Sequence, residues 1–580
     1  MTVFASSRNR AQGVFLAAAA GDALGWPQEA RGGMVGGKRA REARRPHAEF
    51  TSWTRGAGSR FLRYPDPVDA GAYSDDTQLL LAVARACSSD DWVRHLTSVE
   101  LPSWPFYQRG GGRAVLRAAN GWAENRPPWI PSNRPDGVER ANDYFRAGAN
   151  GVAMRIAPHV LWSHFHSAGR PTLPERVIRD GVLTHGHPRA LVGATVYAAA
   201  LDFALGSTET VGAGDLLTAA RFGLRDADEV MTWLPSDWFE YTANRRGDFA
   251  AAWHRTNQEM DDLLRIVRAS LDQGSMSHAT ETLTRLGAIG QYAGSGTISA
   301  AASIYLASRS GTRPISGLLQ GAFQHGADTD TLASMTGGLL GAIHGHDWLG
   351  QLRDVQDSHY LADVADGLVT GREYSLPEPP SSPRIVTREL EDDFRDGGTF
   401  VDGRRYEVVG RAVLSERPWA ARFLLRLEEG QTVTVDRLHR LPPDQPKFNE
   451  VPHLSQAEEE RDRPQLVEPP ITPQVPGNQI TVTLPVSSLG AIARFYSELL
   501  QRQLVIEGNY VVVSDALQFV GAQRGPALWS ADAHIEIRVP DLREVAAKLS
   551  LSLFSDRATD LRASAVDPEG RSVTIRELHP

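Results

Sequence analysis

The chain has 580 residues, with 61 basic side chains against 70 acidic ones and a formal charge of −9. Its 41% hydrophobic and 23% charged content excludes a disordered chain or a fibre, and its length indicates several folded domains. The acidic balance argues against general binding to nucleic acids or anionic membranes, since both reward a basic face. Cys87 is the single cysteine, so an internal disulfide or a thiolate-rich metal site is excluded.

A single cysteine fits a reducing compartment, and the predicted location is cytoplasmic. Residues 1–25 nevertheless combine arginines with an alanine-rich run, which is the outline of a secretory signal. We favour an amphipathic first helix, because cleavage would remove Asp22 or its neighbours, which belong to the candidate site below. The sequence lacks an uncharged apolar run long enough to span a bilayer, so no membrane partner is predicted.

Residues 10–355 are rich in Ala, Leu and Gly, and their apolar runs have helical spacing. Examples of such runs are residues 77–86, 190–205, 283–307 and 332–344. Sustained alternation of the kind typical of strands is not found in this region. We therefore predict an all-α domain over residues 10–355.

The sequence changes character after this domain. Residues 371–384 form a Pro/Ser-rich linker, and short alternating apolar runs then predict a small β-rich module within 385–441. Residues 442–477 are a Pro-rich acidic linker. Residues 478–580 repeat a pattern of strands and one helix, with the helices expected at 489–501 and 542–549. This pattern predicts an α+β domain built from two βαβββ repeats.

Two acidic clusters precede apolar helical runs and are the strongest chemical signal. The first holds Ser74, Asp75 and Asp76, and the second holds Asp328, Asp330 and Thr331. Helix capping explains either cluster alone. Brought together, however, their carboxylates would repel one another unless cations neutralised them, and hard divalent cations prefer such oxygens. The clusters therefore suggest a shared binuclear metal site.

Three further motifs accompany the clusters. GDALGWPQE, residues 21–29, closes the first helix and adds Asp22 and Glu29. GANGVAMR, residues 148–155, is a glycine-rich helix entry that could cradle a phosphate, although an ordinary turn explains it equally well. In the THGHP segment, residues 184–188, we favour a core or ligand-contacting histidine over a metal-ligand pair.

The order of these motifs resembles the ADP-ribosylglycohydrolase family, which includes the dinitrogenase reductase-activating glycohydrolase. The resemblance covers residues 10–355 and implies an orthogonal bundle of helices with a centre of two Mg²⁺ or Mn²⁺ ions. It implies metal ligation by Ser74, Asp75, Asp76, Asp328, Asp330 and Thr331. It implies catalytic roles for Glu29, Asp75 and Asp330. It implies substrate contacts from Asp22, Gly148, Asn150, Gly151, Met154, His185, Gly294 and Gly296.

The reaction implied by the resemblance is metal-dependent hydrolysis of the glycosidic bond between ADP-ribose and a modified acceptor. Such a bond breaks through an oxocarbenium-like state. Either Glu29 or an acid at the metals would handle the proton. The acceptor is a protein, a nucleic acid or a small molecule, with arginine-linked protein weakly favoured.

Two alternatives of another kind stay open. One is a protein that binds ADP-ribose or a partner without turnover. The other is sequestration of a small molecule by the C-terminal domain. The Arg- and Gly-rich loop at residues 31–65 either covers the site and helps to recognise the modified group, or is simply solvated.

Residues 478–580 resemble the vicinal-oxygen-chelate superfamily of glyoxalases and bleomycin-resistance proteins. The resemblance lies in TLPVSSLGAIARFYSELL, AHIEIRVPDLREVAAKL and AVDPEGRSVTIREL. His534 and Glu577 stand at two of the superfamily's usual ligand positions, but Thr481 stands at another. The incomplete set favours a binding or structural module over a working metal centre. Because these domains often pair, a homodimer is left open.

Overall fold

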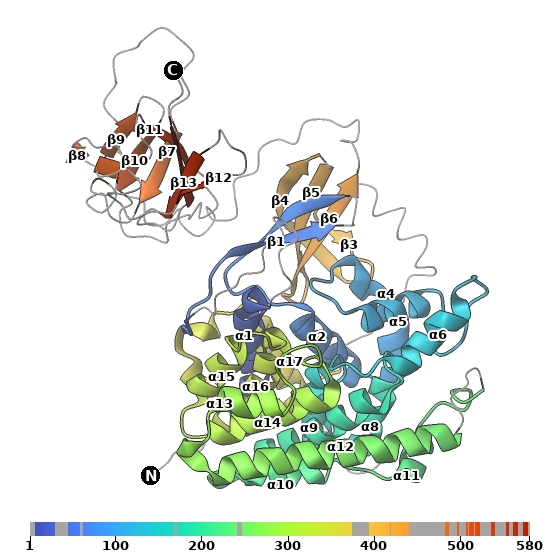
Figure 1. Cartoon of the computed structure of the whole chain (residues 1–580). Helices are drawn as coiled ribbons and strands as arrows, with labels where there is room; N and C mark the ends of the chain where they lie inside the picture. The colour runs from blue at the N-terminus through green and yellow to red at the C-terminus, as the bar shows by residue number, and fades with distance from the viewer. Residues whose placement is uncertain are drawn as a thin grey trace. The chain divides into compact units, whose positions relative to one another are not determined.

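The structure is a computed structural model of the whole chain (Figure 1). It describes residues 6–29, 45–58, 62–166, 171–240, 246–373, 394–417 and 419–439, and short segments between 482 and 577. The chain divides into two compact units, Met1–Asp462 and Arg463–Pro580. The helical region and the β-rich module therefore belong to one unit.

The first unit is mostly helical, as the sequence predicts. Its first α-helices are α1 (Ser7–Gly25), α2 (Asp75–Cys87), α3 (Trp92–His95), α4 (Leu101–Ser103), α5 (Arg113–Ala123), α6 (Gly137–Arg146), α7 (Ala157–His166), α8 (Leu173–Gly181) and α9 (Pro188–Gly206). They are followed by α10 (Asp215–Arg221), α11 (Ala227–Met231), α12 (Arg246–Asp272), α13 (Ala279–Arg285), α14 (Gly296–Arg309), α15 (Pro314–Ala322), α16 (Thr329–His344) and α17 (Ser358–Thr370). Short 3₁₀ turns include η1 (Trp26–Gln28), η3 (Trp104–Phe106) and η4 (Ala153–Arg155).

Helices α1 and α16 pack against each other at the centre of the bundle. Small residues let the two backbones approach closely, because a Cβ atom on Gly21 or Gly25 would lie 2.3 or 2.2 Å from a carbonyl oxygen of α16. The Thr329 hydroxyl also donates to the Gly25 carbonyl, at 2.8 Å. This contact brings the end of α1 beside the start of α16.

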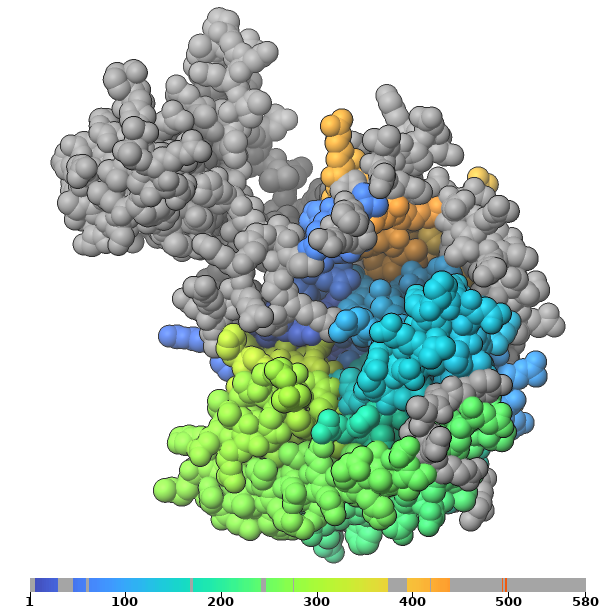
Figure 2. All heavy atoms as spheres, turned by 45° about the vertical axis from the view of Figure 1, so that its right-hand side comes forward, coloured from blue at the N-terminus to red at the C-terminus, as the bar shows by residue number. Residues whose placement is uncertain are grey.

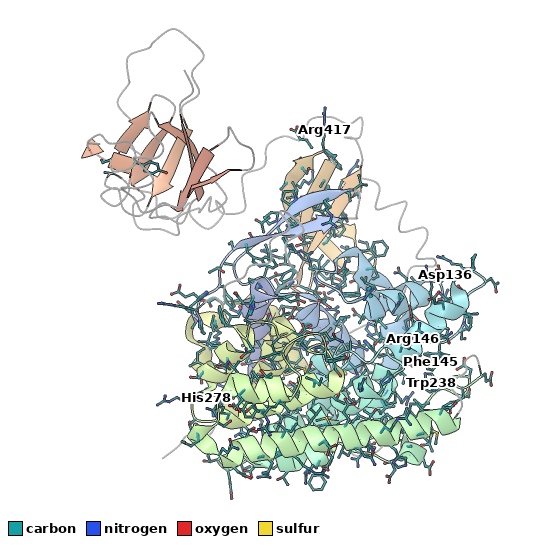
Figure 3. The ribbon with its side chains drawn as sticks, viewed as in Figure 1. Asp136, Phe145, Arg146, Trp238, His278 and Arg417 are labelled. Atoms are coloured by element: carbon teal, nitrogen blue, oxygen red, sulfur yellow. The ribbon has the colours of Figure 1, made fainter. Side chains whose placement is uncertain are left out.

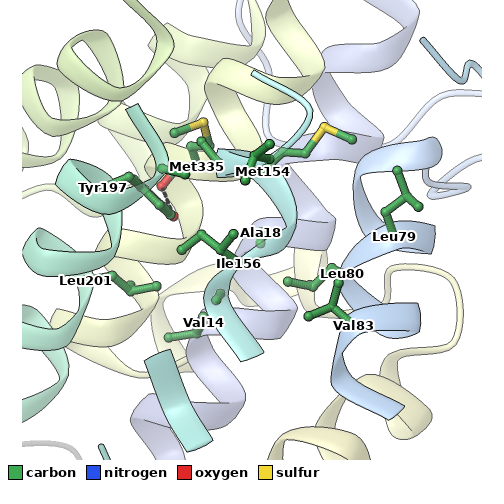
Figure 4. Close-up of a cluster of buried hydrophobic side chains, with 14 of the residues drawn as sticks. Val14, Ala18, Leu79, Leu80, Val83, Met154, Ile156, Tyr197, Leu201 and Met335 are labelled. Carbon is green, nitrogen blue, oxygen red and sulfur yellow. Dashed lines mark hydrogen bonds between the residues drawn. The ribbon is translucent and has the colours of Figure 1, made fainter. Parts of the chain in front are cut away.

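A continuous hydrophobic core surrounds this pair (Figure 4). Side chains from α1, α2, α9 and α16 meet there, and the Tyr197 hydroxyl donates to the Met335 carbonyl at 2.9 Å. Among the described residues, α9 alone is long and apolar enough to cross a membrane by length and composition. It is 72% buried within the protein, as a core helix of a globular domain is.

Aromatic side chains close the bundle beside α6. Phe145 and Trp238 lie side by side with ring centroids 4.8 Å apart, close to Arg146, the last residue of α6 (Figure 3). The Trp238 indole N–H donates to the Tyr144 hydroxyl at 2.8 Å. These contacts bind α6 to the segment that precedes α12.

The structure corrects two expectations for the helical region. The predicted run at 283–307 is two helices, α13 and α14, because glycines at 287, 290, 294 and 296 interrupt it with a turn. An antiparallel hairpin, β1 (Trp53–Gly58) and β2 (Arg63–Val68), also lies within residues 10–355, for which the sequence predicts an all-α domain. Prolines and glycines in these strands hide the usual strand signal.

The β-rich module forms a four-stranded antiparallel sheet in the order β3-β4-β5-β6. Its strands are β3 (Gly398–Thr399), β4 (Arg405–Glu416), β5 (Trp419–Leu427) and β6 (Thr432–His439), and Arg417 marks the turn between β4 and β5 (Figure 3). The hairpin β1–β2 lies against this sheet in both whole-molecule views (Figures 1 and 2). Tyr64 of β2 donates to Asp436 of β6 at 2.9 Å.

The C-terminal unit contains two sheets with the same strand order, β7-β10-β9-β8 and β11-β14-β13-β12. In each sheet the strands that are first and fourth along the chain pair in parallel, β7 with β10 and β11 with β14. The other pairs are antiparallel, which confirms the predicted repeat. The strands are β7 (Val482–Val486), β8 (Ile506–Glu507), β9 (Tyr510–Ser514), β10 (Leu517–Gly521), β11 (Ile535–Val539), β12 (Leu553–Ser555), β13 (Leu561–Val566) and β14 (Ser572–Glu577). Apart from residues 493, 496 and 497, which are helical, the two predicted helices lie outside the described residues.

Candidate active site

The first acidic cluster occupies the N-terminus of α2. Ser74 is the N-cap residue, and its hydroxyl accepts from the backbone N–H of Asp76 at 3.3 Å. Asp75 and Asp76 form the first turn and are 7% and 3% exposed. The helix dipole favours carboxylates at this position, but their deep burial exceeds what capping requires.

Asp22 of α1 lies directly behind this cluster. Its carboxylate accepts from the backbone N–H groups of Ser74 and Thr77 and from the Thr77 hydroxyl, the last at 2.6 Å. The side chain is fully buried, so both oxygens are engaged inside the protein. This is the position of a structural cap that fixes the start of α2, whereas the sequence resemblance implied a substrate contact.

The second cluster occupies the N-terminus of α16 and meets Glu29. Carboxylate oxygens of Glu29, Asp328 and Asp330 lie within 4.8 Å of one another. Glu29 follows η1 at the end of α1 and is half-buried, as is Asp328. The close packing of α1 on α16 thus places an acid expected to be catalytic in the same group as two expected metal ligands.

A hydrogen bond joins the two clusters. The Thr331 hydroxyl donates to Asp76 Oδ1 at 3.3 Å. Burial raises the pKa of Asp76 well above its ordinary value, and the charges of Asp22 and Asp75 raise it further. The pKa of Asp330 is also well above its ordinary value, through burial and then through Glu29 and Asp328. The site therefore concentrates negative charge that protons or cations must neutralise.

These residues fit a hard divalent cation. The donors are carboxylate and hydroxyl oxygens, which Mg²⁺ and Mn²⁺ prefer. Asp76 Oδ2 is buried, and none of the residues that the structure describes donates a hydrogen bond to it. Within the described residues the three-carboxylate group of Glu29, Asp328 and Asp330 is the one that meets the spacing of a metal site, so the geometry supports a cation site without establishing two ions.

Two glycine-containing segments pair beside the acids. Asn150 N–H donates to the Gly294 carbonyl at 2.9 Å, and Gly296 N–H donates to the Gly148 carbonyl at 3.0 Å. The Asn150 side chain donates to Asp328 Oδ2 at 2.9 Å. A Cβ atom on Gly294 would lie 3.0 Å from the same oxygen. Four residues singled out from the sequence are thus brought together at the second acidic cluster.

His185 lies behind Gly151, whose Cβ position would be 2.9 Å from its ring. Burial, together with the nearby charge of Arg155, lowers the pKa of His185 to about 3, so the ring is neutral at ordinary pH. Its Nδ1 lies 2.8 Å from the Thr184 hydroxyl. His187, the other histidine of the segment, instead caps α9 by accepting from the Arg189 N–H at 3.1 Å.

Met154 is placed differently from the polar residues. It lies in η4 and packs in the hydrophobic core near Met335 (Figure 4). The Met154 side chain is 7% exposed, so the structure places it in the hydrophobic core. Its expected contact with substrate stays a prediction.

One neighbouring segment was missed from the sequence. Gly110 has φ +95°, and a Cβ atom there would lie 3.0 Å from Asp75 Oδ1 and 3.4 Å from the Trp26 indole nitrogen. The preceding residue, Arg109, stacks over Trp26 at 5.6 Å from the ring centroid. The run Arg-Gly-Gly-Gly at 109–112 was the available signal, since glycines permit close backbone approach.

Several expectations fall outside the described residues. Residues 31–44 and 59–61 of the proposed covering loop are among them, as are Thr481 and His534. Glu577 ends β14. The expected ligand set of the C-terminal domain therefore stays a prediction.

The fold and the acidic site together define the class of protein. The ADP-ribosylglycohydrolase family model matches residues 5–376, well over half of the chain, and the chain belongs to that family. Family members are often metal-dependent, in keeping with the oxygen-rich site. The match ends before the β-rich module begins.

Two solved structures give partial matches. A chain from an ADP-ribosylglycohydrolase-related protein complex is 20% identical, with 63% of this chain and 98% of that chain covered at a TM-score of 0.38. A glyoxalase / bleomycin resistance protein from Catenulispora acidiphila DSM 44928 is 15% identical, with 17% of this chain and 98% of that chain covered at a TM-score of 0.15. No curated protein matches the sequence.

Proposed function

We propose that the protein hydrolyses the glycosidic bond between ADP-ribose and a modified acceptor, with divalent cations at the acidic site. The observation that carries the proposal is the convergence of α1, α2 and α16 on one group of carboxylates, of which Asp75, Asp76 and Asp330 are buried. Burying such a group lowers the free energy of unfolding, so a stable fold alone does not account for it. Arginine-linked protein is the first substrate to test.

The chain's own residues divide the work as follows. Asp75, Asp76, Asp328, Asp330 and the Thr331 hydroxyl would hold the cations, which when bound supply positive charge and an activated water. Asn150 orients Asp328 through its hydrogen bond. Glu29 is half-buried, so it can exchange a proton with solvent as well as face the acids, and we assign it the proton transfer.

The test is release of free ADP-ribose from an arginine-ADP-ribosylated protein, with excess Mg²⁺ or Mn²⁺ and with a chelator. We expect release that the chelator abolishes. Asp330→Ala and Asp75→Ala should each abolish release while circular dichroism shows a retained fold. Full activity of both variants would overturn the proposed site.

A negative result would also distinguish between the remaining hypotheses. ADP-ribose binding that depends on metal, without release from this substrate, would indicate another linkage or a binder without turnover. If neither release nor binding occurs, the proposed reaction is wrong.

A further inference from the structure

Asp66 of β2 is fully buried and binds arginines from three different parts of the chain. Arg55 of β1 contacts it, Arg109 lies 2.5 Å away and Arg422 of β5 lies 2.5 Å away. We call these four residues the arginine lock. A buried carboxylate with several charged donors is specific in geometry, and losing one donor leaves unsatisfied charge in the interior.

The lock joins the β-rich module to the hairpin. Arg422 also binds both oxygens of Asp436, at 2.8 and 2.7 Å, and donates to the Pro67 carbonyl at 2.7 Å. Tyr64 completes the contact by donating to Asp436. Strand β2 is therefore held along its length by β5 and β6.

Arg55 and Arg109 connect the arginine lock to the acidic site. The guanidinium groups of Arg55 and Arg109 lie 5.1 and 5.6 Å from the Trp26 ring centroid, and Trp26 precedes Glu29 by three residues. Arg109 is joined directly to Gly110, whose backbone lies against Asp75. A shift of Arg109 would thus move the backbone that borders Asp75.

A second contact holds the start of α2. Asp357, next to α17, accepts from the Tyr73 hydroxyl at 2.7 Å and from the backbone N–H of Thr432 at 2.8 Å. Tyr73 immediately precedes Ser74, and Thr432 is the first residue of β6. Farther along α2, Arg85 donates to Gln431 at 2.9 Å. The module therefore supports α2 at both ends.

We propose that the β-rich module is an integral part of the acidic site, which it positions through Arg422 and the arginine lock. The inference rests on the proposed metal site, and it goes beyond the family match because residues 394–439 lie outside the matched region. Arg422 is a positioning residue, since it acts on Asp75 through Asp66, Arg109 and Gly110.

The experiment measures Mn²⁺ affinity of the full chain by titration calorimetry, and kcat and KM where ADP-ribose release is found. We expect Arg422→Met to weaken Mn²⁺ binding by about tenfold or more and to lower kcat more than it raises KM. Arg422→Lys keeps one charged donor and should recover part of the affinity. Arg426→Met is the matched control, because Arg426 is exposed on the same strand, and it should bind Mn²⁺ as the unaltered chain does.

The outcomes separate this inference from the proposed function. If the unaltered chain binds Mn²⁺ but releases no ADP-ribose, the calorimetry still tests the lock. Unchanged affinity in Arg422→Met, or equal loss in Arg426→Met, would overturn the positioning role. If Arg422→Met does not fold, Asp436→Asn tests the same link, because it removes the negative charge of one partner of Arg422 and leaves Asp66 in place. Affinity unchanged in that variant would also overturn the inference.

Discussion

The carboxylates at the starts of α2 and α16 illustrate how a residue's surroundings decide its chemistry. Asp22 and Asp76 are both buried aspartates. Asp22 is surrounded by N–H and O–H donors, whereas Asp76 retains a buried oxygen that has no donor among the described residues. The first therefore stabilises a helix start, and the second is suited to a cation.

Asp330→Asn tests whether the acids at the start of α16 bind a cation. Divalent cations that bind the folded state stabilise it by about 2.7 kcal/mol when present at a hundred times their Kd. We expect Mn²⁺ to raise the melting temperature of the unaltered chain and to have little effect on Asp330→Asn, which lacks one of three clustered carboxylates. Differential scanning calorimetry with and without chelator measures the shift. Asp363→Asn, at an exposed acid paired with Arg372, should respond to Mn²⁺ as the unaltered chain does.

His185 gives a pH-dependent prediction. Its pKa is about 3 in the folded state and about 6.5 when unfolded, so acid protonates the unfolded state first. Its contribution to stability is complete above about pH 6.5 and falls by about 2 kcal/mol between pH 7 and pH 5. The difference in unfolding free energy between the unaltered chain and His185→Gln should narrow by that amount in urea titrations.

A suitable control for this titration is His278→Gln, because His278 is exposed at the start of α13 (Figure 3). Its stability curve should run parallel to that of the unaltered chain. If the His185→Gln curve is parallel as well, the low pKa of His185 is wrong.

At the scale of elements, the contact between α1 and α16 decides where the acids meet. The Gly-Asp-Ala-Leu-Gly motif has a packing role as well as a chemical one, because Gly21 and Gly25 admit the backbone of α16. Only this approach brings Glu29 to Asp328 and Asp330. If the axes of α1 and α16 lay farther apart, the same carboxylates would be too far from one another to share a cation.

Gly25→Ala tests the helix contact. The added methyl would lie 2.2 Å from the Thr329 carbonyl oxygen, and overpacking of this kind costs about 1–3 kcal/mol or more. We expect a lower free energy of unfolding and weaker Mn²⁺ binding. Gly247→Ala is the matched change in α12, where no atom of the described part of the chain lies within 4 Å of the added methyl, and it should be neutral or stabilise by up to about 1 kcal/mol. Equal effects of the two changes would contradict the packing argument.

At the scale of the whole molecule, the division into two units does not follow the family boundary. The family match ends at residue 376, whereas the first compact unit continues to Asp462 and includes the β-rich module. The polar contacts of Arg422, Gln431 and Thr432 with Asp66, Arg85 and Asp357, which lie in the family-matched region, explain why. The C-terminal unit has its own two sheets.

Truncation tests this organisation. A chain that ends at Asp462 should fold and keep the Mn²⁺ affinity of the full chain, because it retains the first unit. A chain that ends after residue 376 loses the partners of Asp66 and Asp357 from the module and should bind Mn²⁺ poorly. Calorimetry on the two truncated chains measures both effects. Undiminished binding by the shorter chain would show that the module is dispensable.

The sequence by itself determined most of the elements and the chemistry they carry. Apolar spacing predicted α2, α9 and α16, and the alternating runs predicted the β-rich module and the repeated C-terminal sheets. The motifs identified the acidic residues because helix starts and carboxylates are local features of the chain. The family assignment followed from their order and is confirmed over residues 5–376.

Only the tertiary structure decided which of these residues meet. The hairpin β1–β2, the structural position of Asp22 and the grouping of Glu29 with Asp328 and Asp330 depend on contacts between segments far apart in the chain. Asp66 and Arg422 are separated by more than half of the chain, and no local pattern pairs them. Local spacing specifies the shape of an element, whereas the burial and pairing of its charges depend on what packs against it.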